Sequence, residues 1–245
     1  MKNLLIIALL LFTSVPLHAG EIRVAVASNF ANALREMSAV FTHKTGHKVK
    51  ISTGSTGKHY AQIKNGGPFD IFFAADTRRP ELLDKEGLAV VGSRFTYARG
   101  KLVLWSPQKD LVDNEGRVLE LGNFTYLAVA NPKLAPYGKA AQQVLQKRGL
   151  WNSFRKRMVR GENIGQTFQF VKSGNAPLGF VAASQVKRGG VISEGSFWEV
   201  PEEYYSAINQ QAVLLKNNEV AQSFISFVRS EEGLSIIRDF GYEAP

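Results

Sequence analysis

The sequence alternates short apolar segments with amphipathic helical patterns, and this alternation occurs in two runs. The predicted strands of the first run are 21–26, 47–53 and 68–76. A stripe of apolar residues at positions 30, 34, 37 and 41 predicts a helix between the first two strands. Because strands that alternate with helices form mostly parallel sheets covered by helices, the pattern predicts an α/β fold.

The second run repeats this alternation without a flexible linker before it. Its predicted strands are 101–107, 126–132 and 176–184. One predicted helix follows "ANP" at 130–132, and another lies within 162–174. A strand at 208–215 and two C-terminal helices complete the chain. Two such halves predict two lobes connected by strands, and ligands of α/β folds lie at the carboxyl ends of strands.

The first twenty residues have the pattern of a secretory signal. Lys2 precedes an apolar run from Leu4 to Phe12, Pro16 follows it, and Ala19 provides a small residue near a cut site. The run is too short for a membrane anchor. We therefore expect residues 1–20 to be a cleavable signal peptide.

The chain contains no cysteine, which excludes disulfides, thiolate metal ligands and cysteine nucleophiles. An exported chain without cysteine indicates a periplasmic protein. The formal net charge is +9, which is consistent with a solvated basic surface or with attraction of a small anion. Export argues against nucleic acid as a partner.

Four polar loops each follow a predicted strand and precede a predicted helix. They are Ser28-Asn29, Ser55-Thr56-Gly57, Pro136-Tyr137-Gly138 and Asn163-Ile164-Gly165. The first turn of a helix has unpaired backbone N–H groups and the positive end of the helix dipole, so several helix starts together can bind an anion. Ser, Thr and Asn are also common N-caps, which is the simpler interpretation of each loop alone.

Signatures of enzymes and metal sites are weak in this sequence. His43 and His47 have the i, i+4 spacing of a metal pair, but a glycine at 46 interrupts the helix and the surroundings are basic. A catalytic triad through His59 and Ser55 would lack a nucleophile-elbow motif. We therefore expect no catalytic residues and no direct protein ligands to a bare metal cation.

Two other pairs allow alternative interpretations. Asp70 and Asp76 flank an apolar strand and could act in acid–base catalysis, although capping and loop roles are more common. The adjacent phenols of Tyr204 and Tyr205 could bind ferric iron, or could pack at the edge of a cleft.

Several segments resemble, in order and spacing, the periplasmic molybdate-binding proteins of ABC importers. They are "VAVASNFANAL", "STGSTGKHYAQIKNGGPFDIFFAAD", "ANPKLAPYGKAAQQVL" and "GENIGQTFQFVKSGNAPLGFVAASQV". The resemblance implies the two-lobed type II periplasmic binding protein fold, with a mixed, mostly parallel sheet covered by helices in each lobe and the ligand in the cleft between them. The implied lobes are 21–99 with 206–245, and 100–205.

The resemblance also implies the ligand contacts. They are Ser28 and Asn29 in the first loop, Ser55 or Thr56 in the second with Thr56 preferred, and Tyr137 and Ile164 from the second lobe, largely through backbone N–H groups. Part of the family uses a tyrosine where this chain has Ala182. The implied substitute for that tyrosine is Asn29.

The implied function is capture of molybdate, and of tungstate, by a monomer without a cofactor. The implied partners are an inner-membrane permease and its ATPase. Another ligand, sulfate or thiosulfate, or ferric iron through Tyr204 and Tyr205, is the alternative that the residues leave open.

Overall fold

A computed structural model describes residues 19–243. The predicted signal peptide therefore lies, except for its last two residues, outside the described part of the chain. Between residues 19 and 243, no helix has the length and apolar character needed to cross a bilayer.

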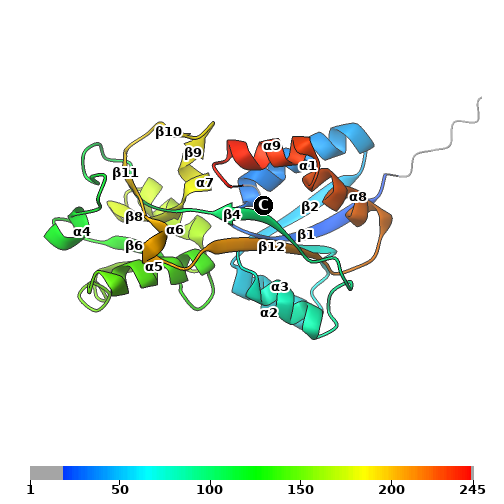
Figure 1. The fold of residues 1–245 in the computed structure, drawn as a ribbon, viewed down its shortest axis with the longest axis horizontal. Coiled ribbons are helices and arrows are strands. Elements are labelled where there is room, and N and C mark those ends of the chain that lie inside the picture. Colours follow the sequence, from blue (N-terminus) through cyan, green and yellow to red (C-terminus); the bar gives the residue numbers. More distant parts are fainter. Residues whose placement is uncertain (1–18, 244–245) are drawn as a thin grey trace, which may run out of the picture.

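The first sheet has five strands in the order β2-β1-β3-β12-β4 (Figure 1). Its strands are β1 (Glu21–Ala27), β2 (Lys48–Gly54), β3 (Ile71–Ala74), β4 (Phe95–Gly100) and β12 (Ile208–Leu214). Its helices are α1 (Ala31–Thr45), α2 (Thr56–Lys64), α3 (Arg78–Lys85), α8 (Glu219–Val228) and α9 (Glu231–Asp239). One core packs α1, α8 and α9 on one face, and a smaller core packs α2 and α3 on the other.

The second sheet has the strand order β11-β5-β8-β6-β7. Its strands are β5 (Leu102–Ser106), β6 (Leu127–Ala130), β7 (Met158–Gly161), β8 (Leu178–Ala182) and β11 (Ser196–Glu199). Its helices are α4 (Val118–Leu121), α5 (Pro136–Lys147), α6 (Ile164–Lys172) and α7 (Ala183–Val186), with a short 3₁₀ turn, η1 (Glu202–Tyr204). A small hairpin joins β9 (Lys187–Arg188) to β10 (Val191–Ile192).

The chain passes between the two sheets twice, at residue 101 and through 200–207 (Figure 1). Strands β4 and β12 are antiparallel to their neighbours in the first sheet, and so are β5 and β11 in the second. The other pairings, β1 with β2 and β3, and β6 with β7 and β8, are parallel. The predicted two-lobed α/β fold with a mixed sheet in each lobe is confirmed. Each sheet has two parallel and two antiparallel pairings, so the sheets are not mostly parallel as expected, and the antiparallel pairings are those of the strands next to the crossings.

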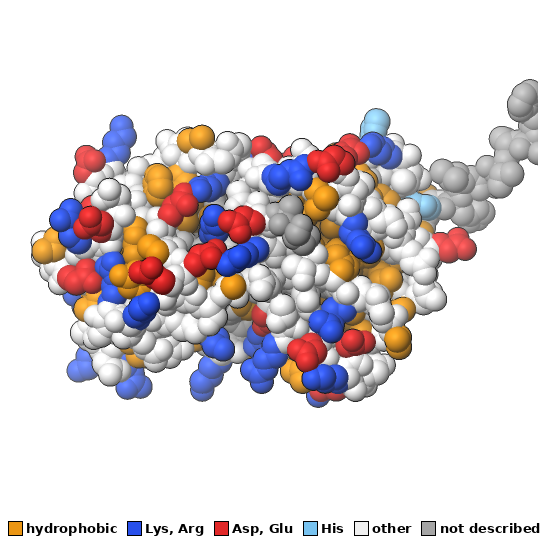
Figure 2. Space-filling view, in the orientation of Figure 1, with side chains coloured by type: hydrophobic (Ala, Val, Ile, Leu, Met, Phe, Trp, Pro, Cys, Tyr) orange, Lys and Arg blue, Asp and Glu red, His pale blue; other side chains and the backbone are white. Residues whose placement is uncertain are grey.

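The basic and acidic side chains are mixed on the face seen in Figure 2. Lys and Arg lie on both lobes, with Asp and Glu among them. Many of these residues form exposed ion pairs, such as Lys64 with Glu86 at 2.9 Å and Lys85 with Glu81 at 2.7 Å. Exposed pairs of this kind contribute little to the free energy of unfolding.

Candidate functional site

A small cavity of about 10 Å³ lies between the two lobes. From the first lobe it is lined by Ala27, Ser28, Asn29, Gly54, Ser55, Thr56 and Ala75. From the second lobe it is lined by Ala135, Pro136, Tyr137, Asn163 and Ile164. All six residues predicted to contact the ligand therefore line one cavity.

The topology of the sheets explains why these loops meet. Strands β1 and β2 are parallel neighbours, so the loops that follow them, with Ser28 and Ser55, leave the same edge of the first sheet. Strands β6 and β7 are parallel neighbours in the second sheet, and Tyr137 and Ile164 follow them. The two sheet edges face each other across the cavity.

The cavity is rich in unpaired backbone donors. Ile164 is the first residue of α6, Thr56 is the first residue of α2, and Tyr137 is the second residue of α5. Such positions have no intrahelical acceptor. Between residues 19 and 243, no hydrogen bond engages the backbone N–H groups of Asn29, Ser55, Thr56, Tyr137 and Ile164.

Three hydroxyl groups at the cavity add further donors. Ser28 Oγ accepts a hydrogen bond from the Gly165 N–H at 3.0 Å, and Thr56 Oγ1 accepts one from the Ala75 N–H at 3.0 Å. Ser55 Oγ accepts one from the Lys58 N–H at 3.3 Å. Because each oxygen already accepts a bond, each hydroxyl proton is free to be donated to a ligand.

The residues that line the cavity are all neutral. Charged residues near the lining residues in the sequence pair with each other, Lys58 with Glu162 at 3.1 Å and Asp76 with Arg79. Burial raises the pKa of the Tyr137 phenol well above its usual range, so this side chain is neutral. The site therefore combines many N–H and O–H donors with neutral surroundings, which suits an unprotonated anion.

The N-cap interpretation is correct for two of the loops and wrong for the first. Ser55 caps α2, and Asn163 caps α6 by accepting from the Gln166 N–H at 2.9 Å. Helix α1, which lies wholly within the described residues, has Phe30 at its N-cap position and no side-chain cap. Ser28 and Asn29 precede the N-cap position, Phe30, and neither side chain caps the first turn of α1.

The Asn29 side chain has a different role from the predicted one. Its Nδ2 group donates to Gln210 Oε1 at 2.6 Å and to Tyr242 Oη at 3.0 Å, and the side chain is buried. Both of its N–H donors are therefore used within the protein. In this arrangement the Asn29 side chain has no N–H left to donate in place of the family's tyrosine, whereas its backbone N–H has no partner among residues 19–243. Ala182 is buried in the core of the second lobe and does not line the cavity.

The two lobes touch each other around the cavity. The Gly57 N–H of the first lobe donates to the Leu134 carbonyl of the second at 2.9 Å. Ser184 Oγ, from α7 of the second lobe, donates to the Asn29 carbonyl at 2.9 Å. The Gly165 bond to Ser28 is a third contact. A ligand in this cavity would be enclosed by both lobes.

The alternative candidates lie elsewhere. Tyr204 and Tyr205 do not line the cavity: Tyr204 packs against Trp198, and Tyr205 Oη accepts from the Leu102 N–H at 3.2 Å. The ferric-iron alternative is therefore not supported. Within residues 19–243 there is no cluster of three His, Cys, Asp or Glu residues that could hold a metal ion.

The remaining polar candidates are already paired with structural partners. His59 Nδ1 lies 3.0 Å from Gln62 Oε1, and its hydrogen-bond partner is not Ser55. Asp70 Oδ2 accepts from the Arg23 N–H at 2.7 Å, and Asp76 Oδ1 accepts from the Arg79 N–H at 3.0 Å. These contacts agree with capping and loop roles for both carboxylates.

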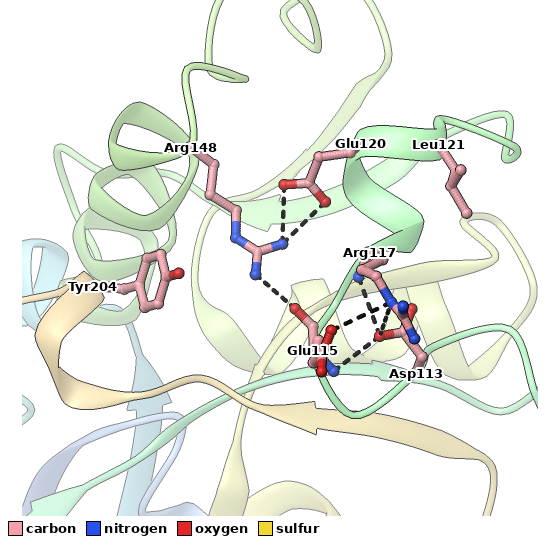
Figure 3. A pocket seen from close by; sticks show the side chains of 7 residues that line it. All are labelled: Asp113, Glu115, Arg117, Glu120, Leu121, Arg148 and Tyr204. Carbon is pink, nitrogen blue, oxygen red and sulfur yellow. Dashed lines mark hydrogen bonds and ion pairs between the residues drawn. The ribbon is translucent and has the colours of Figure 1, made fainter.

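A wider hollow lies on the outer surface of the second lobe (Figure 3). Arg148 lines it and donates to both carboxylate oxygens of Glu120 at 3.1 Å and to the Glu115 carbonyl at 2.6 Å. Arg117 lies beside Asp113 and Glu115. The charged groups of this hollow bind one another. It therefore has fewer free polar groups for a ligand than the cavity between the lobes.

Comparison with known proteins gives three consistent results. Residues 22–243 match the family described as bacterial extracellular solute-binding protein. The chain is 48% identical to the molybdate-binding protein ModA of Azotobacter vinelandii over 91% of this chain and 90% of that protein, and 45% identical to the ModA of Rhodobacter capsulatus over 96% and 93%. The solved structure of the Azotobacter vinelandii periplasmic molybdate-binding protein superimposes with a TM-score of 0.88 at 43% identity, covering 91% of this chain and 99% of that one.

Proposed function

The chain belongs to the bacterial extracellular solute-binding proteins and, among them, to the molybdate-binding family, and from this membership we propose that it captures molybdate and delivers it to an ABC importer. The observation that carries the proposal is the cavity between the lobes, where backbone N–H and hydroxyl donors converge without a charged side chain in its lining. Its relatives are named as binding proteins, so the function is transport and not catalysis.

Six residues form the proposed oxyanion site. Ser28, Ser55 and Thr56 donate through hydroxyl groups, and Asn29, Tyr137 and Ile164 donate through backbone N–H groups. Hydrogen bonds to a charged acceptor contribute about 1.5–3 kcal/mol each, so several of them together favour binding of a dianion. Molybdate and tungstate have four equivalent oxygens, and donors from both lobes can reach all of them while the cleft closes.

The donors also favour particular anions. Hydrogen phosphate carries an O–H group, which could be paired here only by a Ser or Thr hydroxyl that accepts from it and gives up its own donation to the ligand, at a cost of about 1–3 kcal/mol. Sulfate is unprotonated, so only the size of the cavity can distinguish it from molybdate. The proposed order of affinity is molybdate and tungstate first, then sulfate, then phosphate.

The finer features of the proposal follow from the same family. The mature protein acts in the periplasm as a monomer, after loss of residues 1–20, and needs no cofactor. Its partners are a permease of the inner membrane and the ATPase of that permease. We keep 21–99 with 206–245 and 100–205 as the limits of the two lobes, which divide the chain near its two crossings.

Titration calorimetry with molybdate, tungstate, sulfate and phosphate tests the proposal. We expect a sub-micromolar dissociation constant for molybdate and weak or absent binding of sulfate. Ser28→Ala is expected to weaken molybdate binding about tenfold, the equivalent of one hydrogen bond to a charged oxygen. Ser226→Ala, which removes an exposed hydroxyl on α8, is the control and should leave binding unchanged. Tighter binding of sulfate than of molybdate would contradict the proposal.

A further inference from the structure

Gln210 is a fully buried polar residue behind the site, and it does not line the cavity. It lies on β12 between Ile208 and Ala212, whose side chains are also buried. Its Oε1 accepts from Asn29 Nδ2 at 2.6 Å and from the Tyr97 hydroxyl at 3.0 Å. Its Nε2 donates to the Tyr137 hydroxyl at 3.3 Å.

The Gln210 side-chain amide contacts one residue from each lobe, Asn29 and Tyr137. Asn29 lies in the turn after β1 of the first lobe, and Tyr137 lies in the first turn of α5 of the second. Both residues line the cavity, and within residues 19–243 the backbone N–H of neither is bonded to another group. One side chain thus contacts two ligand-binding residues that come together only when the lobes approach.

A second observation supports the same contact. Gly100, at the end of β4 and next to the first crossing, lies against this network. A Cβ atom at this position would lie 2.0 Å from the Tyr137 hydroxyl and 2.6 Å from Gln210 Nε2. Only glycine therefore leaves room for the bond between Gln210 and Tyr137 beside the crossing strand.

We propose that Gln210 is a positioning residue that couples the Asn29 turn of the first lobe to α5 of the second, and so holds the two halves of the oxyanion site in their binding geometry. This inference rests on the proposed function. In the closed arrangement the Gln210 amide is paired with both lobes, whereas separation of the lobes breaks its bond to Tyr137. The bond therefore opposes opening of the bound state and slows release of the ligand.

The test measures the rates of molybdate association and dissociation by stopped-flow fluorescence, with Gln210→Met as the variant. Methionine has a similar length and is apolar, so it removes the bonds and keeps the volume. We expect the dissociation rate to rise about tenfold while the association rate stays within about twofold, because contacts made only in the bound state act mainly on dissociation. A residue that only stabilised the fold would lower the melting temperature and leave the dissociation rate of the folded molecules unchanged.

Gln211→Met is the matched control. Gln211 is the next residue on β12, and its side chain bonds Arg94 at 3.0 Å and Thr96 at 3.2 Å, away from the cavity. This variant should release molybdate at the wild-type rate. If Gln210→Met also releases molybdate at that rate, the inference is wrong. If the wild-type protein binds no molybdate, the proposed function and this inference both fall.

Gln210→Glu provides an independent arm if the methionine variant does not fold. A protonated carboxyl can still accept from Asn29 and donate to Tyr137, whereas a carboxylate loses the donor and places a negative charge near the dianion. The titratable groups that face this position are the phenols of Tyr97, Tyr137 and Tyr242, whose pKa values burial raises, so they stay neutral. At pH 5 the carboxyl is protonated, and the dissociation rate should lie within about twofold of the wild-type value. Burial raises the pKa of a carboxyl group, so any rise in the rate is expected only at the alkaline end of the range. A dissociation rate at pH 5 as high as that of a variant without the bonds would overturn the inference.

Discussion

The Gly165 N–H donates to Ser28 Oγ at 3.0 Å, and this bond joins the first turn of α6 in the second lobe to the turn after β1 in the first. The approach is close enough that a Cβ atom on Gly165 would lie 3.0 Å from Ser28 Cβ. The absence of a side chain at Gly165 therefore allows the two lobes to meet at the proposed ligand.

Gly165→Ala should weaken molybdate binding by about 1–2 kcal/mol, because the added methyl group overpacks the contact with Ser28. The free energy of unfolding of the ligand-free protein should change less, because a gain in helix propensity opposes the crowding of Ser28 and of Asn163 Oδ1, which would lie 3.1 Å from the added Cβ. Gly165 lies in a helix without a positive φ, and alanine is the better helix former. Titration calorimetry gives the first quantity and urea unfolding the second. Unchanged affinity in a stable variant would show that the lobes do not need this close approach.

The Asn29 side chain should matter through its partners and not through a bond to the ligand. Asn29→Ala removes the bonds to Gln210 and Tyr242 and should weaken molybdate binding by about 1–2 kcal/mol. Asn29→Asp keeps the shape, loses both N–H donors and adds a negative charge beside the anion, so it should weaken binding more than alanine does. Calorimetry at pH 7.5 measures the two variants side by side.

The critical result for Asn29 is which variant, Asn29→Ala or Asn29→Asp, loses more affinity for molybdate. If Asn29→Asp binds molybdate as well as the wild-type protein does, the side chain is not held as described. Asn175→Asp is the control, because it makes the same chemical change at an exposed asparagine that does not line the cavity. This control should leave the affinity for molybdate unaltered.

Most of the fold and the residues at the cavity could be predicted from local patterns. The strands that precede the loops at Ser28 and Tyr137 are short and apolar, and the strand before Ser55 alternates polar and apolar residues. Parallel strands bring their carboxyl ends to one edge. The resemblance named Ser28, Ser55 and Ile164 among the contacts, and the structure places them around one cavity. Their role as ligand contacts stays a prediction.

Other features depend on contacts that a local pattern does not contain. No bounds were predicted for β4, or for β7 before the Asn163 loop, because "FTYARG" and "MVRG" carry arginine and lack a clear apolar run. The partners of Asn29 are 181 and 213 residues away in the chain, so its side-chain role could not be predicted from neighbouring residues. The alternation Ile208, Gln210, Ala212 on one strand face was the available signal for a buried amide.

The affinity for molybdate should change little between about pH 6 and 8, because the described residues that line the cavity include no histidine or carboxylate. The phenol of Tyr137 has a pKa raised by burial and stays neutral throughout this range. Calorimetry at pH 6, 7 and 8 in one salt concentration measures the dependence. A steep change in affinity over this range would reveal an ionisable group at the ligand.

His59 should make the stability of the fold, and not its affinity, sensitive to acid. Its imidazole is buried beside Phe69 and Phe72, and within residues 19–243 its Nε2 atom has no hydrogen-bond partner. Burial lowers its pKa below the usual 6.5, although a contact with Gln62 acts in the opposite direction.

The sign of the effect follows from which state binds the proton. Below pH 6.5 the unfolded chain takes up a proton at residue 59 that the folded protein does not, so the free energy of unfolding falls as the pH falls from about 6.5 towards the lowered pKa. Above pH 6.5 both states are neutral and the contribution is constant. Urea unfolding at pH 7.5 and 5.0 should show a loss about 1 kcal/mol larger for the wild-type protein than for His59→Gln. Equal losses in the two proteins would mean that His59 is protonated as easily in the fold as in the unfolded chain, and that its burial does not control its charge.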